Sequence, residues 1–347
     1  MAAGISALSY ALPDGILSHK ELQDRFGIKE MDRIILNTGI LSRRVCLKNE
    51  CASDLAYSAA QKLFEDNDID ITTIDFIIFS SQMPDYLLPT TACILQNRLG
   101  LSKSAGAIDI NLGCSQYLYS HANAFAMVQS GLAKKVLVMT ADTPSRIINP
   151  KDRSVVPLFG DAGTAAIIED VGEGSGYQDF AFGTDGSEHS ALIWPSSGMR
   201  ERYSSDISKE VVDKLGSVRS KNDMYMDGQK IFLFTLKTVP NTLKSFLEKN
   251  HLSIDDIDFF IFHQASKMIV DSIARKLKLP EAKFNRIYEN RGNSGGSTVG
   301  ISLHHAIKDA KIKGNSKIVL SAFGVGLSWC HAILNLQDEL PGSSAVD

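Results

Sequence analysis

The chain has 347 residues, of which 44% are hydrophobic, and its formal net charge is −4. This length is enough for one large domain or two coupled domains around a sizeable core. The charge is mixed, without long runs of Lys or Arg, which argues against nucleic acid or a membrane surface as the main partner. We also expect no membrane span, because no window contains about 18 consecutive apolar residues.

Cysteine usage points to a reducing cytoplasm. The five cysteines are odd in number and form no Cys-X-X-Cys pairs, so the sequence indicates neither a disulfide framework nor a metal site. The first residues alternate apolar and small side chains and lack the basic start and continuous apolar core of a signal peptide. We interpret them as a strand.

The first half of the chain shows alternating helix and strand patterns. An amphipathic helix is expected over residues 52–67, followed by a short apolar strand within ITTIDFIIFS (71–80). The next strand, AIDINL (107–112), ends just before Cys114, and a long helix follows. A further apolar strand lies in KKVLVMTAD (134–142). Short all-apolar runs of this kind are typical of parallel strands covered on both faces.

The second half repeats this order. Residues 173–222 are rich in Gly, Ser and charge, and we expect them to hold the last strands of the first half and then a surface insertion. Residues 223–347 form the second half. They contain an amphipathic helix over 231–250, a strand in IDDIDFFIFH (254–263) and a strand in SKIVLSAFG (316–324).

The two halves match each other at one offset. Asp75 and Asp258 occupy the same place in their strands and are 183 positions apart, while Val136 and Ile318 are 182 apart. Two matches in the same order indicate a duplicated α/β fold whose first half covers residues 1–172.

Cys114 stands where a strand gives way to a helix. A helix N-terminus carries unsatisfied N–H groups and a partial positive charge, which shift a thiol towards the reactive thiolate. The alternative is a buried cysteine that behaves as a small hydrophobic residue. The rest of the chain favours the nucleophile.

The duplication predicts what lies opposite Cys114. The corresponding position of the second half is Ser297, at the start of a helix. His263 directly follows a second-half strand, and Asn293 lies in the glycine-rich loop before that helix. Because strand ends and helix starts converge on one crevice, we expect Cys114, His263 and Asn293 to face each other. Alternatively, His263 is structural and Asn293 caps the helix. The glycine-containing run 323–327 could supply an N–H group to an oxyanion.

Several motifs carry a resemblance to one family: NTGILSRR (37–44), PDYLLPTTACILQNRLG (84–100), DINLGCSQYLY (109–119), PKDRSVVPLFGDAGTAA (150–166), FHQAS (262–266), NRGNSGGS (290–297) and FGVGLSW (323–329). Over nearly its whole length the chain resembles the β-ketoacyl-acyl-carrier-protein synthase III family of the thiolase superfamily. The resemblance implies a five-layered αβαβα fold with two halves related by a pseudo-twofold axis. It also implies a homodimer, acyl carrier protein as partner, and no metal or bound organic cofactor.

The resemblance implies a decarboxylative condensation. Cys114 would take an acyl group from a thioester of coenzyme A or of a carrier's phosphopantetheine. His263 and Asn293 would bind the thioester carbonyl of malonyl-carrier protein while CO2 leaves, and the enolate would attack the acyl group. The backbone N–H groups of Cys114 and Val325 would form the oxyanion hole.

Other positions are expected at the entrance and on the carrier surface. In relatives that use acetyl-coenzyme A, a tryptophan and an arginine hold the coenzyme. Arg33 and Asn37 occupy those two positions here, so whether coenzyme A or a carrier protein brings the acyl group stays open. Arg153 is expected to bind a phosphate. Arg275 and Lys276 are expected to dock the carrier protein.

Further positions are expected to shape the acyl pocket. Leu88 matches a residue that crosses the dimer interface, and Phe159, Phe323 and Leu327 would line the substrate site. The usual glycine triplet has Val325 in its middle, which disfavours a positive φ. These departures suggest a non-housekeeping paralogue with an acyl group other than acetyl.

Three other functions remain open at this point. The first is transfer of the acyl group from Cys114 to an alcohol or amine, without condensation. The second is a papain-like cysteine hydrolase, although its cysteine signature is absent. The third is a non-catalytic partner subunit of a condensing-enzyme heterodimer.

Overall fold

The computed structural model describes residues 1–336, which form two large β-sheets. The first sheet has the strand order β1-β7-β6-β4-β5, and the second has the order β13-β14-β15-β8. The strands of the first sheet are β1 (Ala3–Ala11), β4 (Phe76–Ser80), β5 (Gly106–Ile110), β6 (Lys135–Asp142) and β7 (Ala162–Asp170). Those of the second are β8 (Gly176–Thr184), β13 (Phe259–Phe262), β14 (Ser316–Gly324) and β15 (Ser328–Leu336).

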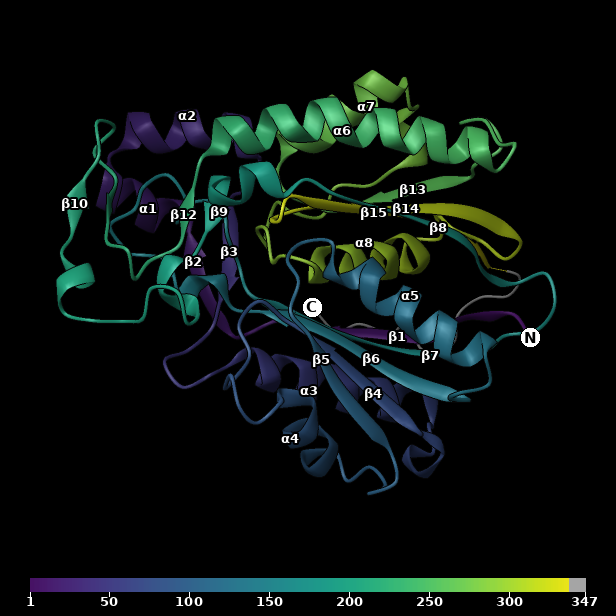
Figure 1. Cartoon of the computed structure of the whole chain (residues 1–347). Helices are drawn as coiled ribbons and strands as arrows, with labels where there is room; N and C mark the ends of the chain where they lie inside the picture. The colour runs from purple at the N-terminus through teal and green to yellow at the C-terminus, as the bar shows by residue number, and fades with distance from the viewer. Residues whose placement is uncertain (337–347) are drawn as a thin grey trace.

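Helices cover both sheets and separate them (Figure 1). One outer layer holds α3 (Ala52–Asn67) and α4 (Thr91–Arg98), and the other holds α6 (Gly228–Lys249) and α7 (Lys267–Leu277). Between the sheets lie α5 (Gln116–Gln129) and α8 (Ser297–Lys308). The five-layered αβαβα thiolase fold is therefore confirmed.

Burial on both faces explains the apolar strands. In β4, Ile77 and Phe79 pack in the core beneath α3, whereas Ile78 packs in the core between the sheets. All three side chains have no exposed surface. A strand covered on both faces needs apolar residues at every position, which is why β4 lacks the alternating pattern.

The two sheets repeat one topology. In the first sheet β6 pairs in parallel with the earlier strand β4, and in the second β14 pairs in parallel with β13. On the other side of this central strand come two strands in antiparallel pairing, β7 then β1 or β15 then β8. The order β1-β7-β6-β4 therefore corresponds to β8-β15-β14-β13. From the sequence, β8 is expected to be one of the last strands of the first half. That expectation is wrong. This strand pairs with β15, so it begins the second repeat, as β1 begins the first.

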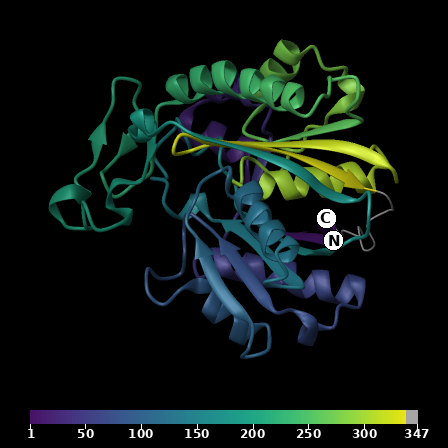
Figure 2. The same ribbon diagram turned by 45° about the vertical axis from the view of Figure 1, so that its right-hand side comes forward.

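The remaining elements stand at one end of the layers. Apart from the short 3-10 turns, they are β2 (Gly15–Ser18), α1 (His19–Phe26), α2 (Ile28–Thr38), β3 (Ser42–Val45), β9 (Leu192–Ile193), β10 (Val211–Val212), β11 (Val218–Arg219) and β12 (Tyr225–Met226). The insertion that carries β10 and β11 stands away from the layered body (Figure 2). Residues 337–347 of the predicted second half lie outside the described residues.

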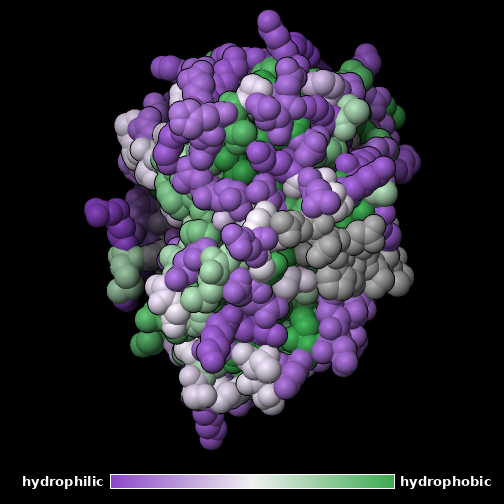
Figure 3. All heavy atoms as spheres, turned by 90° about the vertical axis from the view of Figure 1, so that its right-hand side faces the viewer, coloured by the Kyte–Doolittle hydropathy of each residue, from purple (hydrophilic) through white to green (hydrophobic). Residues whose placement is uncertain are grey.

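The surface is mainly polar on the face shown in Figure 3, where hydrophobic side chains form small, separate groups. Among the helices of residues 1–336, none combines the length and the apolar character needed to cross a bilayer.

Candidate functional site

Cys114 lies in the loop between β5 and α5, and its side chain is 5% exposed. The loop turns tightly, because the Gln116 N–H donates to the Gly113 carbonyl at 2.7 Å. The segment that joins β14 to β15 packs against it. A Cβ at Gly324 would lie 2.6 Å from Cys114 Sγ, so only glycine lets this segment approach the sulfur.

The Cys114 thiol is protonated at neutral pH. Burial raises its pKa to about 12, the Val325 and Cys114 N–H groups oppose this rise, and the nearby Asp142 carboxyl adds to it. In this structure, burial therefore outweighs the shift towards thiolate that is expected at a helix start. The free-energy cost of removing a thiolate from water is larger than the stabilisation that the two N–H groups give it. Those two groups are the predicted oxyanion-hole donors.

His263 follows β13 and is 2% exposed. Its Nδ1 atom lies 2.6 Å from Thr298 Oγ1, and its ring stands edge-on to Phe323, with 5.5 Å between ring centroids. Burial lowers the pKa of His263 to about 3, and the Gly295 carbonyl opposes this fall. The imidazole is therefore neutral at physiological pH.

Asn293 is held by the backbone on both sides. Its N–H donates to the Leu158 carbonyl at 2.9 Å, and its own carbonyl accepts from Gly160 at 3.0 Å. The side-chain Oδ1 accepts from the Gly295 N–H at 3.1 Å. This bond leaves the Nδ2 hydrogens for another acceptor. The cap of α8 is Gly296, without a side-chain bond, so the interpretation of Asn293 as that helix's cap is wrong.

Cys114, His263 and Asn293 line one cavity of about 320 Å³. Phe159, Phe323 and Arg153 line it as well. The cysteine comes from the first half and the other two members of the trio from the second, as the duplication predicts.

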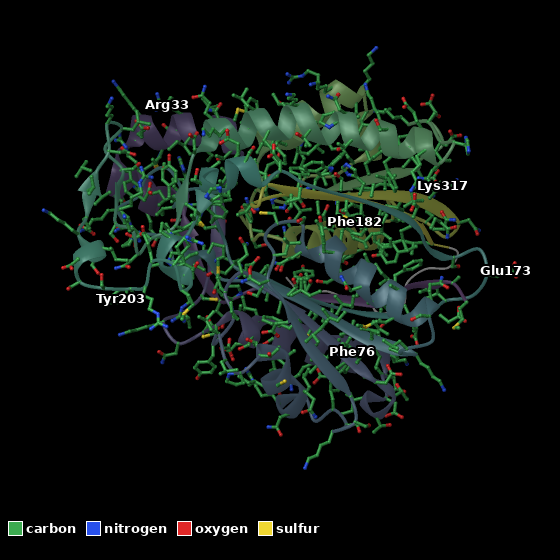
Figure 4. The ribbon with its side chains drawn as sticks, viewed as in Figure 1. Arg33, Phe76, Glu173, Phe182, Tyr203 and Lys317 are labelled. Atoms are coloured by element: carbon green, nitrogen blue, oxygen red, sulfur yellow. The ribbon has the colours of Figure 1, made fainter. Side chains whose placement is uncertain are left out.

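Charged side chains also line this cavity. Arg33 and Asn37 of α2 line it, as does Arg153, and Arg33 donates to Glu30 at 2.8 Å. Figure 4 shows Arg33 on α2, close to the insertion. A Cβ at Gly216 would lie 3.2 Å from the Arg153 guanidinium carbon, so the insertion packs directly on this arginine.

A second cavity, of about 720 Å³, lies on the other side of the Cys114 loop. Gly113 and Val325 line it, together with Leu87 and the polar side chains of Gln82 and Arg146. Residues adjacent to Cys114 thus contact this cavity, whereas Cys114 itself lines the first.

Some predicted residues lie elsewhere. The lining of these two cavities includes neither Leu88, which is 87% exposed, nor Leu327, which is buried. Arg275 and Lys276 lie in the last turn of α7, where Lys276 Nζ donates to the Leu236 carbonyl at 2.8 Å. Neither of them lines the first cavity.

Sequence reasoning missed Asp142, which ends β6 and has no exposed surface. It accepts hydrogen bonds from Gln82 N at 2.9 Å and Gln116 Nε2 at 2.5 Å, and burial raises its pKa to about 7. A Cβ at Gly295 would lie 2.3 Å from Asp142 Oδ2, so this carboxyl joins the Cys114 helix to the Asn293 loop. The available signal was a charged residue that directly follows the apolar run VLVMTA.

Within residues 1–336 there is no group of three or more His, Cys, Asp or Glu side chains that could hold a metal ion.

Fold and site together define an acyltransferase of the thiolase fold. Two sequence models of one family match the chain: 3-oxoacyl-[acyl-carrier-protein] synthase III over residues 108–186, and its C-terminal part over residues 247–336. The chain belongs to the β-ketoacyl-acyl-carrier-protein synthase III family. The predicted membership is therefore confirmed.

Individual relatives cover almost the whole chain. The β-ketoacyl-acyl-carrier-protein synthase III of Caldanaerobacter subterraneus is 34% identical over 96% of this chain and 98% of its own length. The synthase III of Fusobacterium nucleatum is 32% identical over 95% and 98%, respectively.

Solved structures agree with these relatives. A crystal structure of a 3-oxoacyl-(acyl-carrier-protein) synthase III matches with a TM-score of 0.94 and 36% identity, over 97% of this chain and all of that chain. A synthase from Burkholderia xenovorans matches with a TM-score of 0.90 and 32% identity, over 99% and 96%. The members of this family are condensing enzymes. Membership therefore does not favour acyl transfer without condensation, a cysteine hydrolase or a non-catalytic subunit.

Proposed function

We propose that this chain joins an acyl group, carried on Cys114, to malonyl-acyl-carrier protein with loss of CO2. The observation that carries the proposal is the convergence of Cys114, His263 and Asn293 on one buried cavity. A thiol supplies the nucleophile and leaving group for acyl transfer, and two neutral side chains supply hydrogen bonds for an enolate.

The first step exchanges one thioester for another. Cys114 attacks the donor carbonyl carbon, the carbon–sulfur bond to the donor breaks, and the proton of Cys114 leaves with the donor thiol. The carbonyl oxygen that becomes negative would accept from the N–H groups of Cys114 and Val325. Both groups already lower the thiol pKa, which supports their orientation towards the reacting atoms.

The second step makes the carbon–carbon bond. The malonyl carboxylate leaves as CO2, and its bonding electron pair forms an enolate whose oxygen accepts from His263 Nε2–H and Asn293 Nδ2–H. The enolate carbon attacks the acyl carbon and expels the Cys114 thiolate, which then takes up a proton. The low pKa of His263 supports this role, because a neutral imidazole donates without supplying a proton to quench the enolate.

The cavity entrance suits a phosphate-bearing arm. Arg153 and Arg33 both line it, and we infer that Arg153 binds the phosphate of phosphopantetheine, whether coenzyme A or a carrier protein brings it. The same proposal includes three further points. The carrier protein docks at Arg275 and Lys276, the protein acts in the cytoplasm, and the reaction uses no metal or bound cofactor.

We infer a homodimer from two exposed features. Leu87 and Leu88 are 70% and 87% exposed beside the second cavity, and β5 is an edge strand of the first sheet. A second copy that covers both would bury this apolar loop and close that cavity. Leu88 would cross the interface and limit the acyl chain in the partner subunit.

The test is a panel of acyl thioesters of coenzyme A and of carrier protein. Mass spectrometry should find the acyl group on Cys114, and malonyl-carrier protein should then give CO2 and a β-ketoacyl product. Acylation without any CO2 release from malonyl-carrier protein would overturn the proposal.

A further inference from the structure

Thr298 is the second residue of α8 and has no exposed surface. Its Oγ1 atom lies 2.6 Å from His263 Nδ1, 3.1 Å from the Gln264 backbone nitrogen and 3.0 Å from the Gly295 carbonyl oxygen. A threonine hydroxyl has one hydrogen to donate, and the Gln264 N–H already donates to its oxygen. Two acceptors, His263 Nδ1 and the Gly295 carbonyl, therefore compete for one proton.

The choice between these acceptors decides the tautomer of His263. If Thr298 donates to Nδ1, the neutral imidazole carries its hydrogen on Nε2. If Thr298 donates to Gly295, Nδ1 must carry the hydrogen and Nε2 has only a lone pair. The Gly295 carbonyl also accepts from the Thr298 N–H at 3.3 Å, so the first arrangement leaves it with a partner.

Only the arrangement in which Thr298 donates to Nδ1 can stabilise an enolate. A lone pair on Nε2 would face the negative oxygen and repel it, whereas Nε2–H would donate to it. We propose that Thr298 is a positioning residue, which donates to Nδ1 and thereby holds His263 in the Nε2–H tautomer for the decarboxylation step. This inference rests on the function proposed above.

The variant Thr298→Val keeps the branched shape and removes the hydroxyl. His263 Nδ1 would then lack its donor and would no longer be held as an acceptor. The Gly295 carbonyl, which already hydrogen-bonds His263, would favour the tautomer that carries its hydrogen on Nδ1. We expect decarboxylation of malonyl-carrier protein to lose about 10- to 100-fold in kcat, with KM little changed. Acylation of Cys114 should stay within about twofold of wild type, since that step does not use Nε2–H. Thr298→Ser should restore decarboxylation.

Ser302→Ala is the matched control. Ser302 lies one turn further along α8, is also fully buried, and donates to Asn285 Oδ1 at 2.6 Å. Its loss removes a buried hydroxyl without changing any contact of His263. We expect both half-reactions of this variant at close to wild-type rates.

The tautomer itself is measured by nitrogen-15 NMR of protein labelled in its eight histidines. The signals of His263 are those lost in His263→Gln. We expect Nε2–H in wild type and in Thr298→Ser, and Nδ1–H in Thr298→Val.

Four results would each overturn the inference: Nδ1–H in wild type, undiminished decarboxylation by Thr298→Val, equal loss of both half-reactions in that variant, or an equal loss in Ser302→Ala. If Thr298→Val does not fold, the wild-type tautomer still decides the matter. A wild-type protein that releases no CO2 contradicts the proposed function, while the tautomer still tests Thr298.

Discussion

One added methyl group at Gly113 should disturb acyl transfer strongly. A Cβ there would lie 1.6 Å from Val325 Cγ1, 3.0 Å from Val325 Cβ and 3.1 Å from Gln82 Oε1. Carbon atoms in contact stand about 3.5–4.0 Å apart, so either the Cys114 loop or the Val325 loop must move. Overpacking of this kind costs about 1–3 kcal/mol. We expect Gly113→Ala to lose that much stability and to acylate Cys114 more slowly, because the Val325 N–H shifts from the sulfur.

The double variant Gly113→Ala/Val325→Ala tests the cause. Without the methyl groups of Val325, its Cβ becomes the nearest atom of that residue, at 3.0 Å, and most of the overlap is gone. Because the two positions touch, we expect a coupling free energy of about 0.5–3 kcal/mol, with the double variant more stable than the sum of the single changes. Gly186→Ala is the control, since a Cβ there meets no atom within 4 Å.

Urea unfolding gives the free energies, and mass spectrometry of the acyl adduct over time gives the acylation rates. Additive effects within about 0.5 kcal/mol would refute the packing argument. So would acylation of Gly113→Ala at the wild-type rate, because the oxyanion-hole geometry would then not depend on this contact.

Three further predictions follow from the site. Cys114→Ala should abolish the acyl adduct and keep the unfolding temperature, and an adduct on Cys46 or Cys93 in wild type would contradict the assignment. His263→Ala should acylate normally but lose about 10²- to 10³-fold in condensation; equal loss of both half-reactions would argue against its role. Burial raises the pKa of Asp142 to about 7 from an ordinary 3.8. Between these two pH values the folded protein binds one proton more than the unfolded chain, so the free energy of unfolding of wild type should fall as the pH rises from about 4 to 7. Asp142→Asn should flatten that slope in urea unfolding at several pH values. It should also speed alkylation of Cys114 by iodoacetamide, because the carboxylate no longer raises the thiol pKa; an unchanged slope and rate would show that Asp142 is not the responsible group.

Local patterns predicted the elements of the fold well. The helix expected over 52–67 is α3 with the same bounds, and the helix expected over 231–250 is α6, which begins a turn earlier at Gly228. Asp227 accepts from the Lys230 N–H and starts α6 there. Such features depend on neighbours in sequence, and the periodicity of apolar residues records them.

The order of strands depended on distant partners. β8 looked like a continuation of the first half, because it follows β7 after a short glycine-rich turn. Its hydrogen bonds go to β15, about 150 residues later in the chain, and no local pattern reports a strand's partner.

The sequence by itself indicated the duplicated α/β plan and singled out the cysteine, histidine and asparagine that the structure brings to one cavity. These follow from periodicity, from an internal offset and from motifs, all of which are properties of the linear chain. Only the tertiary structure decided the protonated state of Cys114, the neutral state of His263 and the contacts of Thr298 and Asp142. Burial and hydrogen bonding set those properties, and both depend on which distant segments fold against one another.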